Sequence, residues 1–232
     1  MKKLVFVLLL SQALPRFTFA QEEKKYVINP GEKPGWAVPF TAAYSNPAFT
    51  PGTVYFKNKT TGGGNLNYSF LSQEMYFIDP KGDTLALAEP KEVDSVVMGK
   101  DVYYNTAEGF VKLDTIAGGV RLCSNYFFNV VNRQVVGAYG APTNLGGNTT
   151  SVRFTSDFVA TKLTAQDIIT LSKDKTFYAG TRPANLKAVS KKTMGNVFGK
   201  KQNAFDLYLQ VNDINFSKRE DIIKLITFMN TQ

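Results

Sequence analysis

The acidic residues are the side chains of this sequence that could most readily do chemistry, and they gather around one predicted hairpin. Asp79 and Asp83 flank a turn, and Glu89, Glu92 and Asp94 follow the next strand. A facing pair of carboxylates can cleave a glycosidic bond by acid–base catalysis, which is one interpretation of this cluster. The other is structural, because an aspartate at the start of a turn hydrogen-bonds its own backbone. No Asp-x-Asp-x-Asp-Gly loop indicates calcium.

Other catalytic groups are scarce in this composition. The chain has no histidine, which excludes Ser-His-Asp and Cys-His catalysis and any histidine-containing zinc or iron site. Cys123 is the single cysteine, so an internal disulfide and a thiolate metal site are excluded as well. Its apolar neighbours predict a protonated, inert thiol. We therefore predict no catalytic residue, no metal site and no cofactor.

Two short patterns resemble catalytic motifs without their context. Ser172 and Lys175 match Ser-x-x-Lys, but the companion motifs Ser-Asp-Asn and Lys-Thr-Gly are missing, which favours chance. The run Gly62-Gly63-Gly64 lacks the lysine and the spaced glycines of a phosphate-binding loop. We interpret it as the flexible loop of a hairpin.

The first twenty residues predict a secretory signal peptide. Lys2 and Lys3 precede the apolar run Leu4 to Leu10, and small residues end the segment at Thr18-Phe19-Ala20. The run is shorter than the ~20 residues that cross a bilayer as a helix. Gln21 follows the predicted cleavage after Ala20, where a lipoprotein would need cysteine. We expect a secreted or periplasmic protein without a transmembrane segment, the alternative being a buried N-terminal strand or helix.

Charge gives a weaker indication of a partner. Without residues 1–20 the chain keeps 24 Lys and Arg against 19 Asp and Glu, a net charge of +5. The basic residues are spread out except in Lys187 to Lys201, where lysines are concentrated. Binding to an anionic polymer is one interpretation of this cluster, and a solvated charged face is the other. No nucleic-acid-binding motif is present.

The elements that must position these residues divide the mature chain into three parts. Residues 21–52 are rich in proline and glycine and predict an extended strap, in which Trp36 either anchors the strap by burial or presents an exposed platform. Residues 53–180 alternate with a period of two and are punctuated by turn residues. This pattern predicts an antiparallel β-meander that forms a sandwich or partial barrel.

The clearest element is a hairpin over Gln73 to Ala88, with Asp79-Pro80-Lys81-Gly82 as its turn. In residues 181–232 the apolar spacing becomes helical, and Ser217-Lys218-Arg219-Glu220 reads as a capping box. We expect two or three short helices that pack on the β domain. The predicted fold class is therefore mainly β (α+β).

Several of these runs resemble a known group of proteins. They are Gly52 to Asn58, Leu66-Asn67-Tyr68, Glu74-Met75, Gly82 to Leu87, and the terminal Phe216 and Glu220 to Leu225. The group consists of secreted, uncharacterised β-rich proteins of Bacteroides-type Gram-negative bacteria. The likeness covers about two thirds of the mature chain, but it lies in turns and core positions, so it implies a fold and no activity.

Three short segments are also similar to the Asp-Ser/Thr-apolar sites that O-glycosylation systems of such bacteria modify. They are Asp83-Thr84-Leu85, Asp94-Ser95-Val96 and Asp114-Thr115-Ile116. The alternative is that their hydroxyls line the solvent face of strands.

The predicted functional surface is an exposed aromatic face of the meander, together with the loop from Tyr139 to Ser151. The candidate ligand-binding residues are Trp36, Tyr55, Tyr68, Tyr76, Tyr103, Tyr104 and Tyr139. The alternative for the tyrosines is packing, and the strand register decides between the two, because a slip of one residue inverts the faces.

From these features we expect a non-catalytic binding or structural module of the periplasm or cell surface, whose partner is a protein or a glycan. The alternatives are a carboxylate-dependent hydrolase acting on an extracytoplasmic substrate, and a protein that binds an anionic polymer through Lys187 to Lys201.

Overall fold

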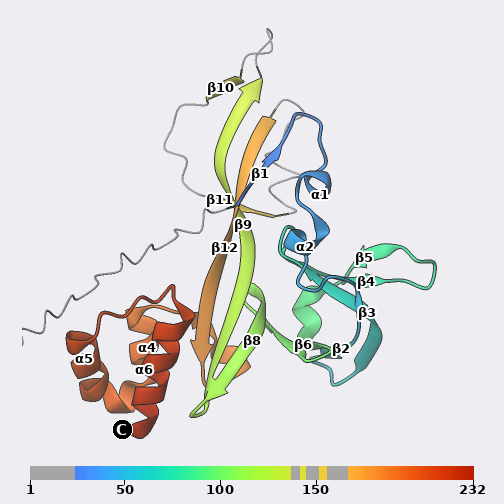
Figure 1. Ribbon diagram of the computed structural model, residues 1–232. Coiled ribbons are helices and arrows are strands. Elements are labelled where there is room, and N and C mark those ends of the chain that lie inside the picture. The colour runs from blue at the N-terminus through green and yellow to red at the C-terminus, as the bar shows by residue number, and fades with distance from the viewer. Residues whose placement is uncertain (1–23, 137–141, 145–151, 156–166) are drawn as a thin grey trace, which may run out of the picture.

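The computed structural model describes residues 24–136, 142–144, 152–155 and 167–232. Within these residues the chain forms one antiparallel sheet followed by helices (Figure 1). The strands are β1 (Lys25–Ile28), β2 (Thr50–Phe56), β3 (Thr61–Ser69), β4 (Glu74–Ile78), β5 (Thr84–Ala86), β6 (Val93–Met98), β7 (Asp101–Thr106), β8 (Gly109–Ala117), β9 (Val120–Val136), β10 (Pro142–Asn144), β11 (Val152–Phe154), β12 (Asp167–Gly180) and β13 (Lys187–Ala188). The helices are α1 (Pro34–Ala37), α2 (Phe40–Ala43), α4 (Lys191–Val197), α5 (Gln202–Val211) and α6 (Arg219–Thr231), with 3-10 turns η1 (Pro90–Glu92), η2 (Pro183–Asn185) and η3 (Gly199–Lys201).

The predicted hairpin is present as β4 and β5. Asp79 Oδ1 accepts hydrogen bonds from the backbone amides of Lys81 at 2.9 Å and Asp83 at 2.8 Å. Gly82 has φ +91°, a conformation that a glycine adopts without steric cost. The structural interpretation of Asp79 and the mainly β fold with a helical C-terminal end are both confirmed.

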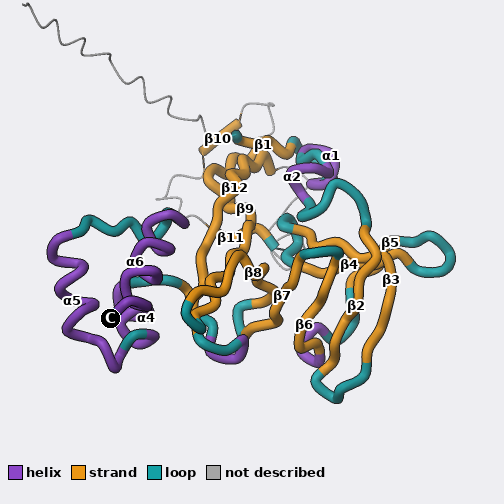
Figure 2. The backbone as a smooth tube through the Cα atoms, turned by 60° about the horizontal axis from the view of Figure 1, so that its bottom comes forward, coloured by secondary structure: helices purple, strands orange, loops and turns teal. Residues whose placement is uncertain are grey.

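The sheet is organised by two long strands, β9 and β12. The strand order is β1-β12-β9-β8-β7-β6-β2-β3-β4-β5. One edge of β9 pairs with β12, and the other pairs in turn with β8, β11 and β10. Figure 1 shows β9 and β12 as a long ribbon, and Figure 2 shows the β2–β7 half of the sheet beside it.

The sheet curls so that distant strands share one core. Between β3 and β8 the strand order places β7, β6 and β2, yet the rings of Tyr68 and Phe110 are 6.1 Å apart. Gln73, in the β3–β4 turn, reaches β9 and donates from Nε2 to the Tyr126 carbonyl at 2.9 Å. The sheet is thus a partial barrel that stays open, with β1 and β5 at the two ends of its strand order.

The C-terminal helices cover one face of the lower β9–β12 ribbon (Figure 1). Side chains two residues apart on a strand share a face, so Val120 and Leu122 of β9 join Phe177 and Ala179 of β12 there. They pack against buried residues of the C-terminal helices and of the turn after α4, namely Met194, Phe198, Phe205, Ile222, Leu225, Ile226 and Met229. In the described part of the chain, no helix combines the length and apolar character that crossing a bilayer requires.

Three local predictions need correction. The predicted strap contains regular structure: β1 pairs with β12, and α1 and α2 each form one turn. Pro34 occupies the first turn of α1 and Pro39 the N-cap of α2, where a missing amide hydrogen costs little. The described part of residues 21–52 is therefore not simply extended.

The predicted Gly62-Gly63-Gly64 loop is part of β3, where these residues pair with Val54, Thr53 and Gly52 of β2. The predicted capping box is also wrong. Helix α6 has Lys218 at its N-cap, one residue beyond Ser217, and no side chain caps it. Residues 1–20, the predicted signal peptide, lie outside the described residues.

Candidate functional site

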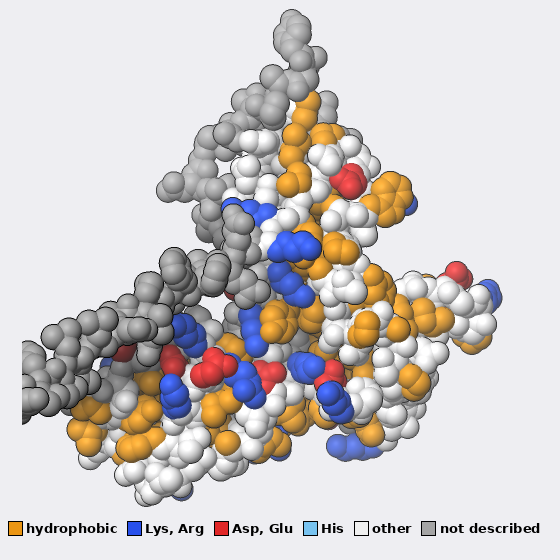
Figure 3. All heavy atoms as spheres, viewed as in Figure 1, with side chains coloured by type: hydrophobic (Ala, Val, Ile, Leu, Met, Phe, Trp, Pro, Cys, Tyr) orange, Lys and Arg blue, Asp and Glu red, His pale blue; other side chains and the backbone are white. Residues whose placement is uncertain are grey.

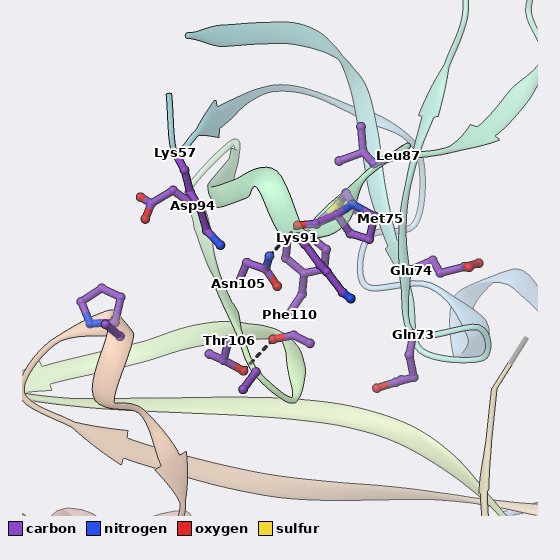
Figure 4. A pocket seen from close by; sticks show the side chains of 15 residues that line it. Lys57, Gln73, Glu74, Met75, Leu87, Lys91, Asp94, Asn105, Thr106 and Phe110 are labelled. Carbon is purple, nitrogen blue, oxygen red and sulfur yellow. Dashed lines mark hydrogen bonds between the residues drawn. The ribbon is translucent and has the colours of Figure 1, made fainter. Parts of the chain in front are cut away.

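A cleft of about 750 Å³ opens where five segments of the chain meet. They are the turn after β2 that contains Lys57, the start of β4, the segment from Leu87 through η1 to Asp94, the β7–β8 turn, and η2 (Figure 4). The residues that form the cleft therefore come from both ends of the β4–β5 hairpin, from the central strands of the sheet and from the segment that follows β12.

The floor of the cleft is apolar. Met75 of β4 is buried while its neighbours Glu74 and Tyr76 are half-buried, as the alternation of a strand requires. Phe110 at the start of β8 is also buried, and Leu87 contributes a half-buried side chain.

Side-chain hydrogen bonds hold the walls of the cleft in place. Asn105 of β7 donates from Nδ2 to the carbonyls of Pro90 at 2.6 Å and Val93 at 3.0 Å, which fastens η1 onto the sheet. Thr106 Oγ1 donates to the Gly109 carbonyl at 2.8 Å and closes the β7–β8 turn. A cleft with fixed walls loses little conformational entropy when a ligand binds.

The basic side chains around the cleft point into it, and the acidic ones do not. Figure 4 shows the side chains of Lys57 and Lys91 reaching into the cleft, whereas the carboxylates of Asp94 and Glu74 lie at opposite ends and point away from each other. Within the described residues neither ammonium forms an ion pair. Two solvated cations over an apolar floor favour a ligand that carries both negative and apolar groups.

Glu74 is engaged by its neighbour rather than by another acid. Its Oε2 accepts a hydrogen bond from the Tyr76 hydroxyl at 2.8 Å. Burial, together with this carboxylate, raises the pKa of Tyr76 to about 12, so the hydroxyl remains a donor at neutral pH. Among the described residues that line the cleft, the two acids, Glu74 and Asp94, do not face each other as a glycosidase pair would (Figure 4).

The predicted aromatic residues do not form one exposed face. Tyr68 and Tyr103 are each 1% exposed and their rings lie 5.5 Å apart in the core. Burial raises the pKa of both phenols. For this pair the packing alternative holds, because β3 and β7 turn these positions towards the inside of the curl.

The other predicted residues are scattered. Tyr55 is 42% exposed on β2, Tyr76 and Tyr104 are half-buried, and Tyr139 lies outside the described residues, as does the loop to Ser151 apart from β10. Trp36 is 73% exposed, with Lys33 Nζ 5.6 Å from its ring centroid, so it does not anchor the N-terminal segment by burial.

The remaining acids and hydroxyls of interest are mostly solvated. Asp83, Glu89 and Glu92 are exposed and do not line the cleft. Of the three Asp-Ser/Thr segments, Thr84 is exposed on β5, whereas Ser95 and Thr115 are half-buried. Among the described residues, no three His, Cys, Asp or Glu side chains gather as metal ligands would.

The structure also accounts for three other features noted in the sequence. Ser172 and Lys175 are three residues apart on β12, so they project to opposite faces and the lysine cannot activate the serine. Cys123 is fully buried, and burial raises its pKa to about 12, as expected for a protonated thiol. In the Lys187 to Lys201 cluster, Lys201 Nζ donates to the Met229 carbonyl at 2.9 Å and so caps the end of α6.

Basic side chains are also visible along the β9–β12 ribbon in Figure 3, which shows one face of the molecule.

No motif in the sequence links the cleft residues Lys57, Lys91, Gln73 and Asn105. The curl of the sheet brings them together, so their position in one cleft could not be predicted from the sequence.

Comparison of the chain with protein-family models, curated proteins and solved structures gave no match.

Proposed function

We propose that this protein is a non-catalytic binding module that holds an extended acidic peptide segment of a partner protein in the cleft. The observation that carries the proposal is the pair of inward-directed lysines, Lys57 and Lys91, above the apolar floor of Met75 and Phe110. An extended peptide that alternates acidic and apolar residues matches this arrangement, because alternate side chains reach one face.

A peptide fits this cleft better than a sugar chain does. The apolar lining comes from Met75, Leu87, Pro90 and Phe110, which are side chains that pack around aliphatic groups. Phe110 is the one aromatic side chain among the described residues of the lining, and it is buried in the floor rather than displayed as a flat stacking surface. Residues 1–20 support a partner in the periplasm or at the cell surface.

The two alternatives have less support. A carboxylate-dependent hydrolase needs two acids that face each other, and Glu74 and Asp94 do not. Binding of an anionic polymer through Lys187 to Lys201 loses one cation to the end of α6, since Lys201 is bonded there.

The proposal is tested by calorimetric titration of the chain starting at Gln21 with a panel of peptides in which Glu or Asp alternates with apolar residues. The double variant Lys57→Ala/Lys91→Ala should weaken binding about tenfold, given roughly 0.7 kcal/mol for each partly solvated ion pair. Raising the salt concentration should weaken binding of the unmodified protein as well.

The matched control is Lys81→Ala/Lys100→Ala, which removes two exposed turn lysines that do not line the cleft. This control should bind like the unmodified protein. Equal affinity of the two double variants for the peptides would refute the proposal. It would also be refuted if uronate oligosaccharides bound saturably and no peptide of the panel did.

A further inference from the structure

The open sheet ends at β5, and one edge of this strand is unpaired. Strand β5 is the last in the strand order and, among the described strands, pairs with β4 alone. Its three residues, Thr84, Leu85 and Ala86, are all exposed. The strand at the other end of the order, β1, begins with Lys25, and charged residues of this kind keep sheet edges apart. No charged residue lies on β5.

The backbone groups on the free edge belong to Thr84 and Ala86. The Leu87 amide donates to the carbonyl of Met75 at 2.8 Å, so the backbone of Leu87 faces β4. Because the backbone groups of successive strand residues point to opposite edges, Leu85 also faces β4, whereas Thr84 and Ala86 face away from it. In the described part of the chain no hydrogen bond reaches the N–H or C=O groups of these two residues. They are spaced to pair with another strand.

The side chain of Leu85 gives this free edge an apolar centre. Leu85 is 45% exposed and lies directly opposite Phe77 of β4, which is partly buried against the core. Residues opposite each other in a strand pair share a face, so the apolar face of the sheet extends to its last strand. A further strand with an apolar side chain beside Leu85 would continue both the hydrogen-bond ladder and this face.

A second copy of β5 has the chemistry that this edge requires. In an antiparallel pair related by a two-fold axis, Thr84 of each copy lies opposite Ala86 of the other copy. Opposite residues of this kind exchange both of their backbone hydrogen bonds, so every free N–H and C=O group on the edge finds a partner. Leu85 then lies opposite Leu85 of the second copy, at a position where cross-strand side chains are closest.

Charge favours this register over its neighbours. It places Lys81, in the turn of one hairpin, level with Glu89 of the second copy, at the base of the other hairpin, and both side chains are exposed. A shift of two residues in one direction sets the acidic Asp83 level with Glu89, which brings two like charges together. A shift in the other direction sets Asp83 opposite Leu85. A shift of one residue leaves the free backbone groups unpaired.

We propose that two copies of this protein associate through the free edges of β5 and form one continuous sheet across a two-fold axis. This surface goes beyond the cleft and does not depend on the peptide proposal. Because β5 has only three residues, the contact is small and the dimer is weak and reversible, with a Kd of about 0.1 mM.

Analytical ultracentrifugation of the chain starting at Gln21 tests the association over a range from about 5 μM to about 1 mM. We expect monomer at the low concentration and mainly dimer at the high one. Ala86→Pro should abolish the dimer, because proline has no N–H to donate to the second copy and is tolerated on the free side of an edge strand. Ala86→Val is the matched control, because it keeps the N–H, and it should dimerise like the unmodified protein.

An exchange of charges tests the register. Lys81→Glu should raise the Kd about fivefold, because it sets two like charges level with each other, and Glu89→Lys should do the same. The double variant Lys81→Glu/Glu89→Lys should recover the affinity of the unmodified protein, because each acidic side chain again meets a basic one.

A cysteine at the two-fold axis tests the geometry directly. Leu85→Cys should form a covalent dimer in oxidised glutathione, because opposite residues at this kind of position have Cα atoms ~4.5 Å apart, within the range of a disulfide. Thr84→Cys lies opposite Ala86 and should not form one. Cys123 is buried in both variants and in the unmodified protein.

Sedimentation as a monomer at about 1 mM would overturn the proposal. Equal association of Ala86→Pro and Ala86→Val would also overturn it, since the contact would then lie on another surface. Failure of the double charge variant to recover affinity would overturn it too, and this result stands whether or not Ala86→Pro folds.

Discussion

Gln73 is the residue that joins the two halves of the curled sheet. Its Nε2 donates to the carbonyls of Phe70 at 2.7 Å and Tyr126 at 2.9 Å, and its Oε1 accepts from Asn125 at 2.8 Å. It does so from φ +64°, a backbone conformation that is unfavourable for a residue with a side chain. These bonds offset the backbone cost and fix the β3–β4 turn against β9.

Replacing Gln73 by alanine should therefore lower the free energy of unfolding by about 2–4 kcal/mol, because several hydrogen bonds are lost and the Asn125 amide is left buried without an acceptor. Urea denaturation measures the change. Gln210→Ala, at an exposed position of α5, is the matched control and should alter stability by no more than about 0.5 kcal/mol. A similarly small effect of Gln73→Ala would show that the turn is not held by this side chain.

Cys123 should make the fold sensitive to alkali. Burial, followed by the nearby Asp114 carboxylate, raises its pKa from 9.0 to about 12. Because the folded-state pKa lies above that of the unfolded chain, this contribution to stability is complete below pH 9 and is lost as the pH rises from 9 towards 12.

Thermal unfolding should accordingly show a melting temperature that falls between pH 9 and 10, and the fall should be smaller in Cys123→Ala. The variant's melting temperature at pH 7 serves as its own reference, because the lost side chain changes packing at every pH. An identical decline in both proteins would assign the alkaline sensitivity to other groups.

Sequence reasoning succeeded for residues whose role is local or compositional. The turn function of Asp79 follows from its position before Pro80 and Gly82, and the burial of Cys123 follows from its apolar neighbours. Lys57 and Lys91 could not be found in this way. Their roles depend on the positions of Met75 and Phe110 in space, which no spacing in the sequence encodes.

At the scale of elements, β2 and β3 place two glycines opposite each other. Gly52 pairs with Gly64. A Cβ atom at Gly52 would lie 2.6 Å from the Val97 carbonyl oxygen, because β6 runs close on its other side, whereas one at Gly64 would meet nothing within 4 Å. Gly52 and Gly64 therefore pair with each other, but only Gly52 is closely packed.

Gly52→Ala should destabilise the protein by about 1–3 kcal/mol through this steric overlap. Gly64→Ala, its partner in the same pair, should be neutral or stabilising by up to about 1 kcal/mol, because alanine restricts the unfolded chain. Chemical denaturation of the two variants side by side checks the difference. Equal effects would contradict the close approach of β6 to β2.

Elements were predictable where a repeating pattern determines them. The period of two gave the strands from β4 to β9, and the helical period of Ile222, Leu225, Ile226 and Met229 gave α6. Prediction failed for Gly62 to Gly64, where pairing with β2 overrides a weak strand propensity. It also failed at Ser217, because a four-residue capping pattern cannot fix the first residue of a helix.

At the scale of the whole molecule, the curl of the sheet creates the cleft. It brings the β3–β4 turn to β9 and leaves the cleft between the β4–β5 hairpin, the β7–β8 turn and η2. The meander was predictable, with a sandwich or a partial barrel as its two possible forms, but the contacts that set the curl, such as Tyr68 with Phe110 across four strand pairings, were not. For the same reason the sequence left open whether Tyr68 and Tyr103 are exposed or packed in the core.

Hydrogen–deuterium exchange of the protein with and without a bound acidic peptide tests the cleft as a peptide-binding site most directly. Protection should appear together in residues 73–75, 87–94, 105–110 and 183–184, which the fold joins around Lys57 and Lys91. Protection confined to Lys187 to Lys201, with exchange in residues 73–75, 87–94, 105–110 and 183–184 unchanged, would contradict the cleft as the binding site.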